Sequence, residues 1–372
     1  MKRIGIDFHV ADGKYQGSRS HVIELFARVI ELSPDLEFFL FLDDTDSLRN
    51  LSASFRLKNV HLVCMSSANP MKRLFWQLPA LAKRYELDIL HCQYILPPML
   101  SCAGMVTIHD VLFESHPEYF ERMFRLRSRI LMRYSACRAA HVFTVSDFSK
   151  SEIAGFFGLN AACISVIYNA ADPDRFFPGD AGQSIVARRG LLPGRYLLTV
   201  GRIEPRKNHS RLLEAYAALG SDTPPLVIVG QIDSRRVNIQ KMIDNLSLSD
   251  RVVLIDDADD SELPALMRHA SMFIYPAIAE GFGMPPLEAM SCGVPVITSN
   301  LTSLPEVVGN AGVLVNPLDT TALTRAISVI LHDAPLRSRL RQAGIERSQK
   351  FSWLESAKLV RERYLAYLKG QQ

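Results

Sequence analysis

Short apolar runs bounded by turn residues alternate with amphipathic segments along the whole chain. This alternation predicts parallel sheets whose strands are joined by covering helices. In the first half we expect strands at 3–7, 37–42, 60–64, 89–92, 105–109, 140–145 and 164–167. In the second half we expect strands at 196–200, 226–229, 252–255, 272–275 and 295–298. The predicted fold class is therefore α/β, with a doubly wound, Rossmann-like arrangement in each half.

The length of 372 residues indicates two domains, because one hydrophobic core rarely serves so long a chain. The segment 169–178 is polar, contains two prolines and follows an expected strand, so we place the connection there. We predict an N-terminal domain over 1–172 and a C-terminal domain over 173–352.

Composition argues against two classes of protein, membrane-spanning and nucleic-acid-binding. The sequence contains no run of about 18 apolar residues, and its first residues lead directly into an expected strand rather than a signal peptide. The net charge of +3 is too small to indicate a nucleic-acid partner. The six cysteines are scattered without metal-ligand spacing, which is typical of reduced thiols. We therefore expect a globular cytoplasmic protein that binds no nucleic acid.

Two glutamates, Glu280 and Glu288, flank a glycine-containing turn after the expected strand 272–275. In open α/β sheets, ligands bind where such loops lead into helix N-termini. Gly281 and Gly283 allow the backbone to approach a ligand closely, and the prolines that follow suit a helix start. We expect Glu288 in the first turn of that helix, where a glutamate also has a purely structural explanation through the helix dipole.

From residue 280 to residue 297 the sequence resembles the donor-site motif of the retaining enzymes of glycosyltransferase family 4, whose two glutamates are also separated by seven residues. The resemblance implies a GT-B fold, in which two Rossmann-like domains face a cleft. It also implies an N-terminal acceptor domain, a C-terminal nucleotide-sugar domain, and a last helix, within 353–372, that crosses back onto the first domain.

The same resemblance assigns roles within the motif. It implies that Glu280 lies by the donor sugar, together with the backbone amides of the turn that follows. Those amides belong to Gly281, Phe282 and Gly283. Glu288 is the residue expected to bind the ribose hydroxyls.

A second motif, from Gly201 to Asn208, follows the expected strand 196–200. A glycine, several cations and then a helix suit a diphosphate, which needs close backbone approach, a forked guanidinium and a point charge. Arg202 and Lys207 match the diphosphate-binding arginine and lysine of the family. We expect Arg206 to be a solvated surface residue.

His109 ends the expected strand 105–109, and the family places a histidine here that faces the donor sugar. Asp110 suits a turn cap or, from its position alone, the general base of an inverting enzyme. The resemblance to retaining enzymes argues against that base.

The loop 12–20 resembles the family's glycine loop beside the donor phosphates and the acceptor, but it departs from the usual pair of glycines. Gly17 alone precedes Ser18, so we take Gly17 as a donor-binding candidate and Arg19 as a weaker one.

Three Asp-x-Asp patterns occur, at 44–46, 172–174 and 257–259, and their number shows how little the pattern alone means. Arg202 and Lys207 can neutralise a leaving diphosphate without a metal. We therefore expect no metal site and no cofactor, with the nucleotide sugar as a substrate.

The segment 122–138 contains six arginines interleaved with apolar residues. Two interpretations stay open: a solvated helix face, and peripheral contact with anionic lipid on the cytoplasmic membrane face, which would suit a lipid-linked acceptor.

These features predict a retaining hexosyltransferase of surface polysaccharide biosynthesis that uses a nucleotide-sugar donor and a saccharide or lipid-linked acceptor. The texture of 275–290 and of the His109 region resembles bacterial mannosyltransferases, which makes GDP-mannose the first expectation for the donor and a UDP-hexose the second. A nucleotide-sugar epimerase of the same fold and a non-enzymatic nucleotide-sugar sensor are the alternatives.

Overall fold

The computed structural model describes residues 1–12, 17–65, 69–233 and 237–370, which form two compact units. The first unit comprises 1–169 and 352–372, and the second comprises 170–351. The boundary lies between Asn169 and Ala170, close to the connection expected after residue 172. The chain enters the second unit once and then returns to complete the first.

The described residues of the first unit form a seven-stranded parallel sheet of order β3-β2-β1-β4-β5-β6-β7. Its strands are β1 (Lys2–Asp7), β2 (Leu36–Leu42), β3 (Val60–Cys64), β4 (Ile89–Gln93), β5 (Ala103–Thr107), β6 (His141–Thr144) and β7 (Ile164–Val166). Its helices are α1 (Gly17–Glu31), α2 (Thr45–Leu51), α3 (Pro70–Lys72), α4 (Leu78–Arg84), α5 (Leu112–Ser115), α6 (Arg122–Arg138), α7 (Asp147–Phe157) and α16 (Trp353–Lys369). One π-helical turn, η3 (Arg73–Gln77), joins α3 to α4.

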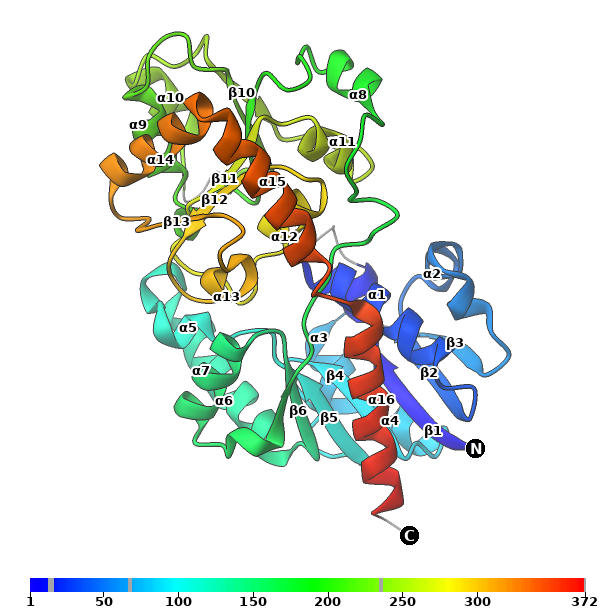
Figure 1. Ribbon diagram of the computed structural model, residues 1–372. Coiled ribbons are helices and arrows are strands. Elements are labelled where there is room, and N and C mark those ends of the chain that lie inside the picture. Colours follow the sequence, from blue (N-terminus) through cyan, green and yellow to red (C-terminus); the bar gives the residue numbers. More distant parts are fainter. Residues whose placement is uncertain (13–16, 66–68, 234–236, 371–372) are drawn as a thin grey trace. The chain divides into compact units, whose positions relative to one another are not determined.

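The described residues of the second unit form a six-stranded parallel sheet of order β10-β9-β8-β11-β12-β13. Its strands are β8 (Leu197–Val200), β9 (Leu226–Val229), β10 (Val252–Ile255), β11 (Met272–Tyr275), β12 (Val296–Ser299) and β13 (Val313–Val315). Its helices are α8 (Gln183–Arg188), α9 (His209–Ala217), α10 (Ile239–Asn245), α11 (Leu263–Arg268), α12 (Met284–Ser291), α13 (Leu304–Val308), α14 (Thr320–His332) and α15 (Ala334–Ser348). The predicted α/β class is confirmed (Figure 1).

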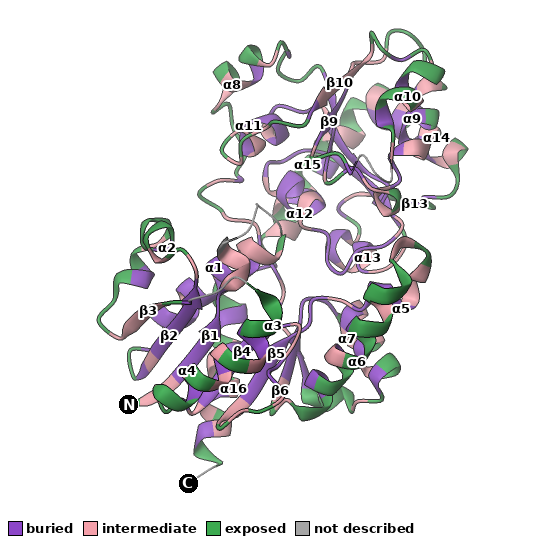
Figure 2. Ribbon diagram, turned by 180° about the vertical axis from the view of Figure 1, so that it is seen from behind, coloured by how far each residue is buried: buried purple, intermediate pink, exposed green. Residues whose placement is uncertain are grey.

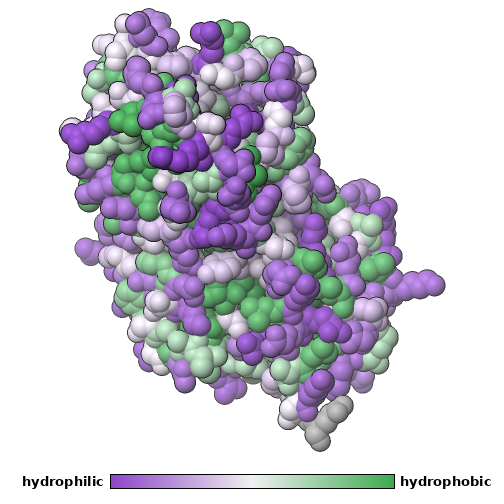
Figure 3. Space-filling model, viewed as in Figure 1, coloured by the Kyte–Doolittle hydropathy of each residue, from purple (hydrophilic) through white to green (hydrophobic). Residues whose placement is uncertain are grey.

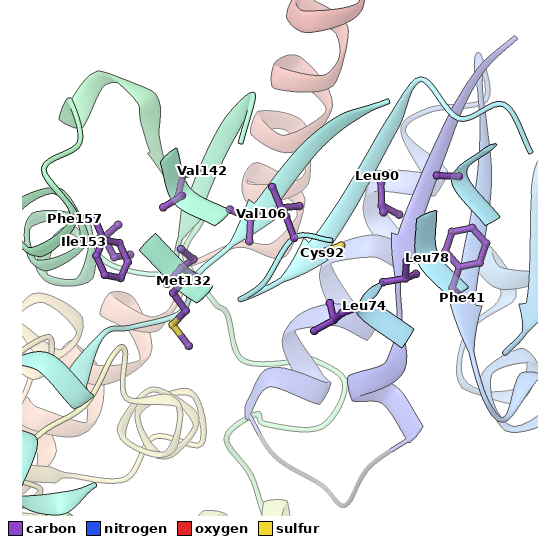
Figure 4. Close-up of a cluster of buried hydrophobic side chains, with 14 of the residues drawn as sticks. Phe41, Leu74, Leu78, Leu90, Cys92, Val106, Met132, Val142, Ile153 and Phe157 are labelled. Carbon is purple, nitrogen blue, oxygen red and sulfur yellow. The ribbon is translucent and has the colours of Figure 1, made fainter. Parts of the chain in front are cut away.

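One cluster of the core of the first unit lies between its sheet and the helices that follow β3, β5 and β6. Leu78 of α4, Met132 of α6 and Phe157 of α7 pack with side chains of the strands, which Figure 4 shows at close range. Burying each such side chain stabilises the fold by about 1.5–3 kcal/mol. The strands β1, β2, β4, β5 and β6 are coloured largely as buried in Figure 2, as expected for a parallel sheet covered on both faces, whereas the edge strand β3 is not buried.

The C-terminal helix α16 belongs to the first unit and lies beside α1 (Figure 1). The Tyr364 hydroxyl lies 2.6 Å from Nδ1 of the buried His91, and the Ser356 hydroxyl donates to the Tyr168 carbonyl at 2.7 Å. The last helix therefore supplies buried contacts to the sheet that the first residues of the chain begin.

Three boundaries differ from the sequence-based expectation at candidate sites. Helix α1 begins at Gly17, so Gly17 and Arg19 lie in a helix rather than in a loop. Strand β5 ends at Thr107, so His109 lies just beyond the strand. Helix α12 begins at Met284 and includes both prolines in its first turn, because an N–H in the first turn of a helix has no partner within the helix and proline lacks one.

Candidate functional site

In the second unit the order of the strands reverses between β8 and β11, which are hydrogen-bonded neighbours. Ligands of doubly wound sheets bind at such a switch point, outside the carboxyl ends of the strands. Both sequence motifs of this unit start there, since Gly201 follows β8 and Pro276 follows β11. Gly201 has φ +153°, a conformation that L side chains rarely adopt.

Lys207, Tyr275 and Glu280 form one hydrogen-bonded cluster at this switch point. The Lys207 ammonium donates to the Tyr275 hydroxyl at 2.6 Å and forms a short ion pair with Glu280. The Tyr275 hydroxyl in turn donates to Oε1 of Glu280 at 2.7 Å. The two predicted residues Lys207 and Glu280 are thus brought together by a tyrosine that the sequence reasoning treated only as the end of a strand.

The electrostatics of the cluster keep Glu280 ionised. Burial alone would raise the pKa of Glu280, but Lys207, Arg206 and the hydrogen bond from Tyr275 outweigh it and lower the pKa to about 2. Burial and the charge of Arg206 lower the pKa of Lys207, against the pull of Glu280. Burial raises the pKa of Tyr275 well above its usual value, so its hydroxyl stays protonated.

Arg206 is not the solvated surface residue that the sequence suggested. Its guanidinium pairs with Glu204 at 2.8 Å and with Glu280 at 3.3 Å, and it donates to the Ala279 carbonyl at 2.9 Å. It therefore ties the loop after β8 to the loop after β11. Arg202 lies differently, with 54% of its side chain exposed and a 3.3 Å contact to Asp233.

The turn between Glu280 and Glu288 is held by side chains of later segments of the chain. The Ser303 hydroxyl donates to the carbonyls of Glu280 and Phe282 at 2.8 and 2.9 Å. The Phe282 ring packs edge-on against Phe351 at 5.7 Å, so its side chain belongs to the core. Gly283 has φ +107°, and a Cβ there would lie 2.6 Å from a methyl group of Leu304.

Glu288 lies on α12, one turn later than expected. The helix starts at Met284, which makes Glu288 its fifth residue, and the first turn carries no acidic residue. The dipole explanation of this glutamate is therefore weaker than the sequence suggested. Glu288 is 7% exposed, and burial raises its pKa to about 7, with Arg175 lowering it and Asp260 raising it further.

His109 lies in the first unit, at the carboxyl edge of its sheet, and is buried. Its Nε2 lies 2.9 Å from Oε1 of Gln93, and its ring packs against Tyr94 with 5.1 Å between centroids. Burial, with smaller effects of His21 and His91, lowers the pKa of His109 well below its usual value. The imidazole is therefore neutral near pH 7.

Gly17 and Arg19 lie in the first turn of α1, and residues 13–16 lie outside the described part of the chain. A Cβ added at Gly17 would meet no atom within 4 Å, so packing does not require a glycine there. The Arg19 guanidinium donates to the Ala11 carbonyl at 3.0 Å. The Asp110 carboxylate accepts from the Leu112 amide at 3.2 Å, as a turn cap does.

In each Asp-x-Asp pattern, one aspartate has a structural role. Asp44 caps α2, Asp172 accepts from the Asp174 amide, and Asp257 pairs with Arg189 at 2.8 Å. Across the described ranges, no group of three or more His, Cys, Asp or Glu side chains is arranged to hold a metal ion. Over the same ranges, no helix has both the length and the apolar character needed to cross a membrane.

Sequence reasoning singled out Lys207, Glu280 and His109 as candidates but not their neutral partners, namely Tyr275, Gln93 and His21. Gln93 and Tyr275 each end a strand that borders a switch point, β4 in one unit and β11 in the other. Polar residues at the ends of the central strands of each sheet were the signal that could have found them.

Two family models match the chain. Residues 15–175 match the model described as Glycosyltransferase Family 4, and residues 190–347 match the model described as Glycosyl transferases group 1. The first model spans most of the first unit, and the second spans most of the second unit.

Curated relatives point to the same family. O-antigen chain mannosyltransferase B of Escherichia coli is 32% identical over 329 residues, which are 84% of this chain and 85% of that protein. O-antigen chain mannosyltransferase RfbU of Salmonella typhimurium is 33% identical over 226 residues, which are 60% of each chain.

Solved structures share the fold. The sucrose-phosphate synthase of Thermosynechococcus elongatus matches with a TM-score of 0.81 at 21% identity and covers 100% of both chains. Anabaena Alr3699/HepE, solved in complex with UDP and glucose, matches with a TM-score of 0.79 at 18% identity, over 98% of this chain and 100% of that one.

Proposed function

We propose that this chain, which belongs to glycosyltransferase family 4 and is therefore a glycosyltransferase of GT-B fold, transfers mannose from GDP-mannose. The proposed acceptor is a saccharide or lipid-linked saccharide of a surface polysaccharide. The names of the E. coli and Salmonella relatives support mannose as the transferred sugar and O-antigen as the kind of product. Transfer with retention of the anomeric configuration is part of the proposal.

The observation that carries the proposal is the cluster of Lys207, Tyr275 and Glu280 at the switch point of the second unit. A nucleotide sugar presents a diphosphate and a hydroxylated ring, which require cations and acceptor oxygens close together. In this proposal, Lys207 and the exposed Arg202 bind the diphosphate, and Glu280 accepts hydrogen bonds from the sugar. No metal ion is required for charge neutralisation.

The backbone and the second glutamate complete the donor site of this proposal. Gly201 and Gly283 let the main chain approach the phosphates, and the amides of Gly281 and Phe282 face them at the start of α12. Glu288 binds the ribose hydroxyls.

The reaction exchanges one glycosidic bond for another. The bond between the anomeric carbon and the diphosphate oxygen breaks, and an acceptor hydroxyl oxygen bonds to the same face of that carbon. The proton of the acceptor hydroxyl passes to the departing phosphate oxygen, while Lys207 and Arg202 stabilise the negative charge that develops on it. In this proposal, the neutral imidazole of His109 lies beside the transferred sugar.

Nucleotide binding and transfer test this function together. Because a ligand that binds the native state raises apparent stability, GDP and GDP-mannose should raise the unfolding temperature more than UDP and UDP-glucose. In the transfer assay, the protein should move radiolabelled mannose from GDP-mannose to polyprenyl-diphosphate-linked oligosaccharides. Selective stabilisation by UDP-glucose would replace mannose with another hexose, an epimer formed without acceptor would indicate an isomerase, and binding without turnover would indicate a sensor. Lack of stabilisation by every nucleotide would overturn the proposal.

We further propose that α6 contacts an anionic lipid surface. Its six arginines include the exposed Arg122, Arg127 and Arg133, and between them Met123, Leu126 and Ile130 are 75%, 54% and 59% exposed. Exposed turns of α6 are coloured as such in Figure 2. Arginines around exposed apolar side chains match the interface between anionic headgroups and acyl chains.

Helix α15 provides a matched control for this surface. It also carries exposed arginines, Arg339 and Arg341, but none of its residues is a strongly exposed large apolar side chain. Hydrophilic and hydrophobic residues are interspersed over the surface in Figure 3. Replacing Arg122, Arg127 and Arg133 by Gln should abolish co-sedimentation with phosphatidylglycerol vesicles, whereas R339Q/R341Q should not. Equal loss in both variants, or equal binding of the native protein to phosphatidylcholine vesicles, would refute the contact.

A further inference from the structure

His21 of α1 is fully buried and contacts three side chains from distant parts of the sequence. Its Nδ1 lies 2.7 Å from Oδ1 of Asn169. Its ring packs edge-on against His109, with 4.6 Å between centroids and 77° between planes, and against Trp353, with 5.7 Å and 73°. One imidazole therefore joins the candidate catalytic histidine to two other elements of the same unit.

Asn169 and Trp353 lie at the two places where the chain passes between the units. Asn169 is the last residue of the first unit before the chain enters the second, and Trp353 starts α16 just after the chain returns. Both connections between the units thus contact His21 at their first-unit ends.

The hydrogen bonds fix which nitrogens carry protons. Oδ1 of Asn169 can only accept, so Nδ1 of His21 carries the hydrogen and donates it, while Nε2 has no hydrogen-bond partner in the described structure. Oε1 of Gln93 likewise accepts from Nε2 of His109, which leaves Nδ1 of His109 as an acceptor. Both rings are then neutral, and the ring of His109 packs against those of both His21 and Tyr94.

We propose that His21 is a positioning residue for His109, and that Asn169 and Trp353 hold His21 so that the two chain connections fix the orientation of the His109 imidazole. The inference rests on the proposed function, which places His109 beside the transferred sugar. His21 itself contacts no substrate in this scheme. Its effect on transfer passes through the ring of His109.

Two substitutions of His21 separate its ring from its hydrogen bond. His21→Asn keeps a donor near Asn169 but removes the ring that packs against His109. His21→Phe keeps a ring and removes the hydrogen bond. His141→Asn is the matched control, because His141 is a partly buried histidine of the same unit that bonds Ser165 at 2.8 Å and packs against Phe143.

The expected kinetic effect lies in kcat rather than in KM for the donor. Misplacement of a reacting group by about 1 Å costs on the order of 100-fold in rate. We expect His21→Asn to lower kcat by roughly that factor while KM changes by less than about threefold. His21→Phe should lose less activity than His21→Asn, and His141→Asn should match the native protein.

Nitrogen-15 NMR of the histidine-labelled protein gives a readout that does not depend on turnover. The His109 signals, assigned with His109→Gln, should show one tautomer with the hydrogen on Nε2 in the native protein, and a mixture of tautomers in His21→Asn. If His21→Asn does not fold, Asn169→Ala provides the same test from the other end of the hydrogen bond.

Each outcome decides one question. Unchanged His109 signals in His21→Asn and Asn169→Ala overturn the inference, even if kcat falls, because the effect would then bypass His109. Unchanged kcat in a protein that transfers sugar overturns it as well. Altered His109 signals in a protein that transfers no sugar to any acceptor refute the proposed function and leave the contact between the two histidines established.

Discussion

Replacing Glu288 by glutamine should make the protein more stable and a weaker nucleotide binder. The buried carboxyl has a pKa of about 7 in the folded protein against 4.5 in the unfolded chain. Because the folded pKa is raised, the protonated form is favoured by folding, and stability is lost as the pH rises from 4.5 through 7. Each pKa unit is worth about 1.4 kcal/mol, so above pH 7 the ionised carboxylate destabilises the fold by about 3 kcal/mol. Glutamine cannot ionise and escapes this effect.

The assay is urea unfolding at pH 8 and at pH 5. Both tryptophans, Trp76 and Trp353, lie in the first unit, so far-ultraviolet circular dichroism rather than tryptophan fluorescence must follow the second unit, which contains Glu288. The free energy of unfolding of E288Q should exceed that of the native protein by about 3 kcal/mol at pH 8 and by much less at pH 5. The exposed Glu214 of α9 provides the control, since E214Q should leave stability unchanged at both pH values.

Binding should change in the opposite direction. A carboxylate that accepts hydrogen bonds from ribose hydroxyls contributes about 1.5–3 kcal/mol, so E288Q should bind GDP roughly tenfold or more weakly at pH 8 in a calorimetric titration. Equal stability of E288Q and the native protein at pH 8 would refute the electrostatic reasoning. Unchanged GDP affinity would refute the ribose-binding role.

Three further predictions concern the same unit. Tyr275→Phe removes the hydroxyl between Lys207 and Glu280 and should weaken GDP binding and lower kcat, whereas Tyr196→Phe, which loses a 2.6 Å bond to the Leu266 carbonyl, should affect stability alone; kinetics and calorimetry compare the two. Lys207→Met leaves Glu280 beside Arg206 as its remaining cation, so calorimetry should detect no GDP binding and urea unfolding should show a loss of about 3–5 kcal/mol; native-like affinity would contradict the diphosphate role. Gly230→Ala places a Cβ 2.0 Å from the Gly201 carbonyl oxygen at φ +153° and should destabilise the unit by more than about 2 kcal/mol. The control Gly220→Ala, whose Cβ meets no atom within 4 Å, should leave stability unchanged. Equal effects of the two substitutions on the urea midpoint would show that the contact between Gly230 and Gly201 is not rigid.

The strands could be predicted, and most of the charged candidate residues could be singled out, because their signals are local. Strands β9, β10 and β11 have the predicted bounds, since each is a short apolar run between turn residues. Helix α15 was not predicted, because of its 15 residues Leu340 and Gly344 are the buried ones and no apolar stripe marks it.

The role of a side chain that depends on remote partners could not be predicted. Tyr275 bonds Lys207 across 68 positions, and His21 bonds Asn169 across 148. Arg206 was misjudged for the same reason, since its partner Glu280 lies far along the chain. Sequence spacing identifies groups that act within one loop, whereas pairing between loops follows from the order of the strands.

The interruption of the first unit by the second determines the order in which a growing chain can complete its parts. A ribosome releases residues 170–351 before 352–372, so the second unit has all its residues while the first still lacks α16. Until that helix emerges, His91 has no Tyr364 hydroxyl, and His21 has no Trp353 ring. The unit whose synthesis begins first is therefore completed last. Translation of a messenger RNA truncated near its 3′ end would yield a chain with a complete second unit and a first unit that lacks α16.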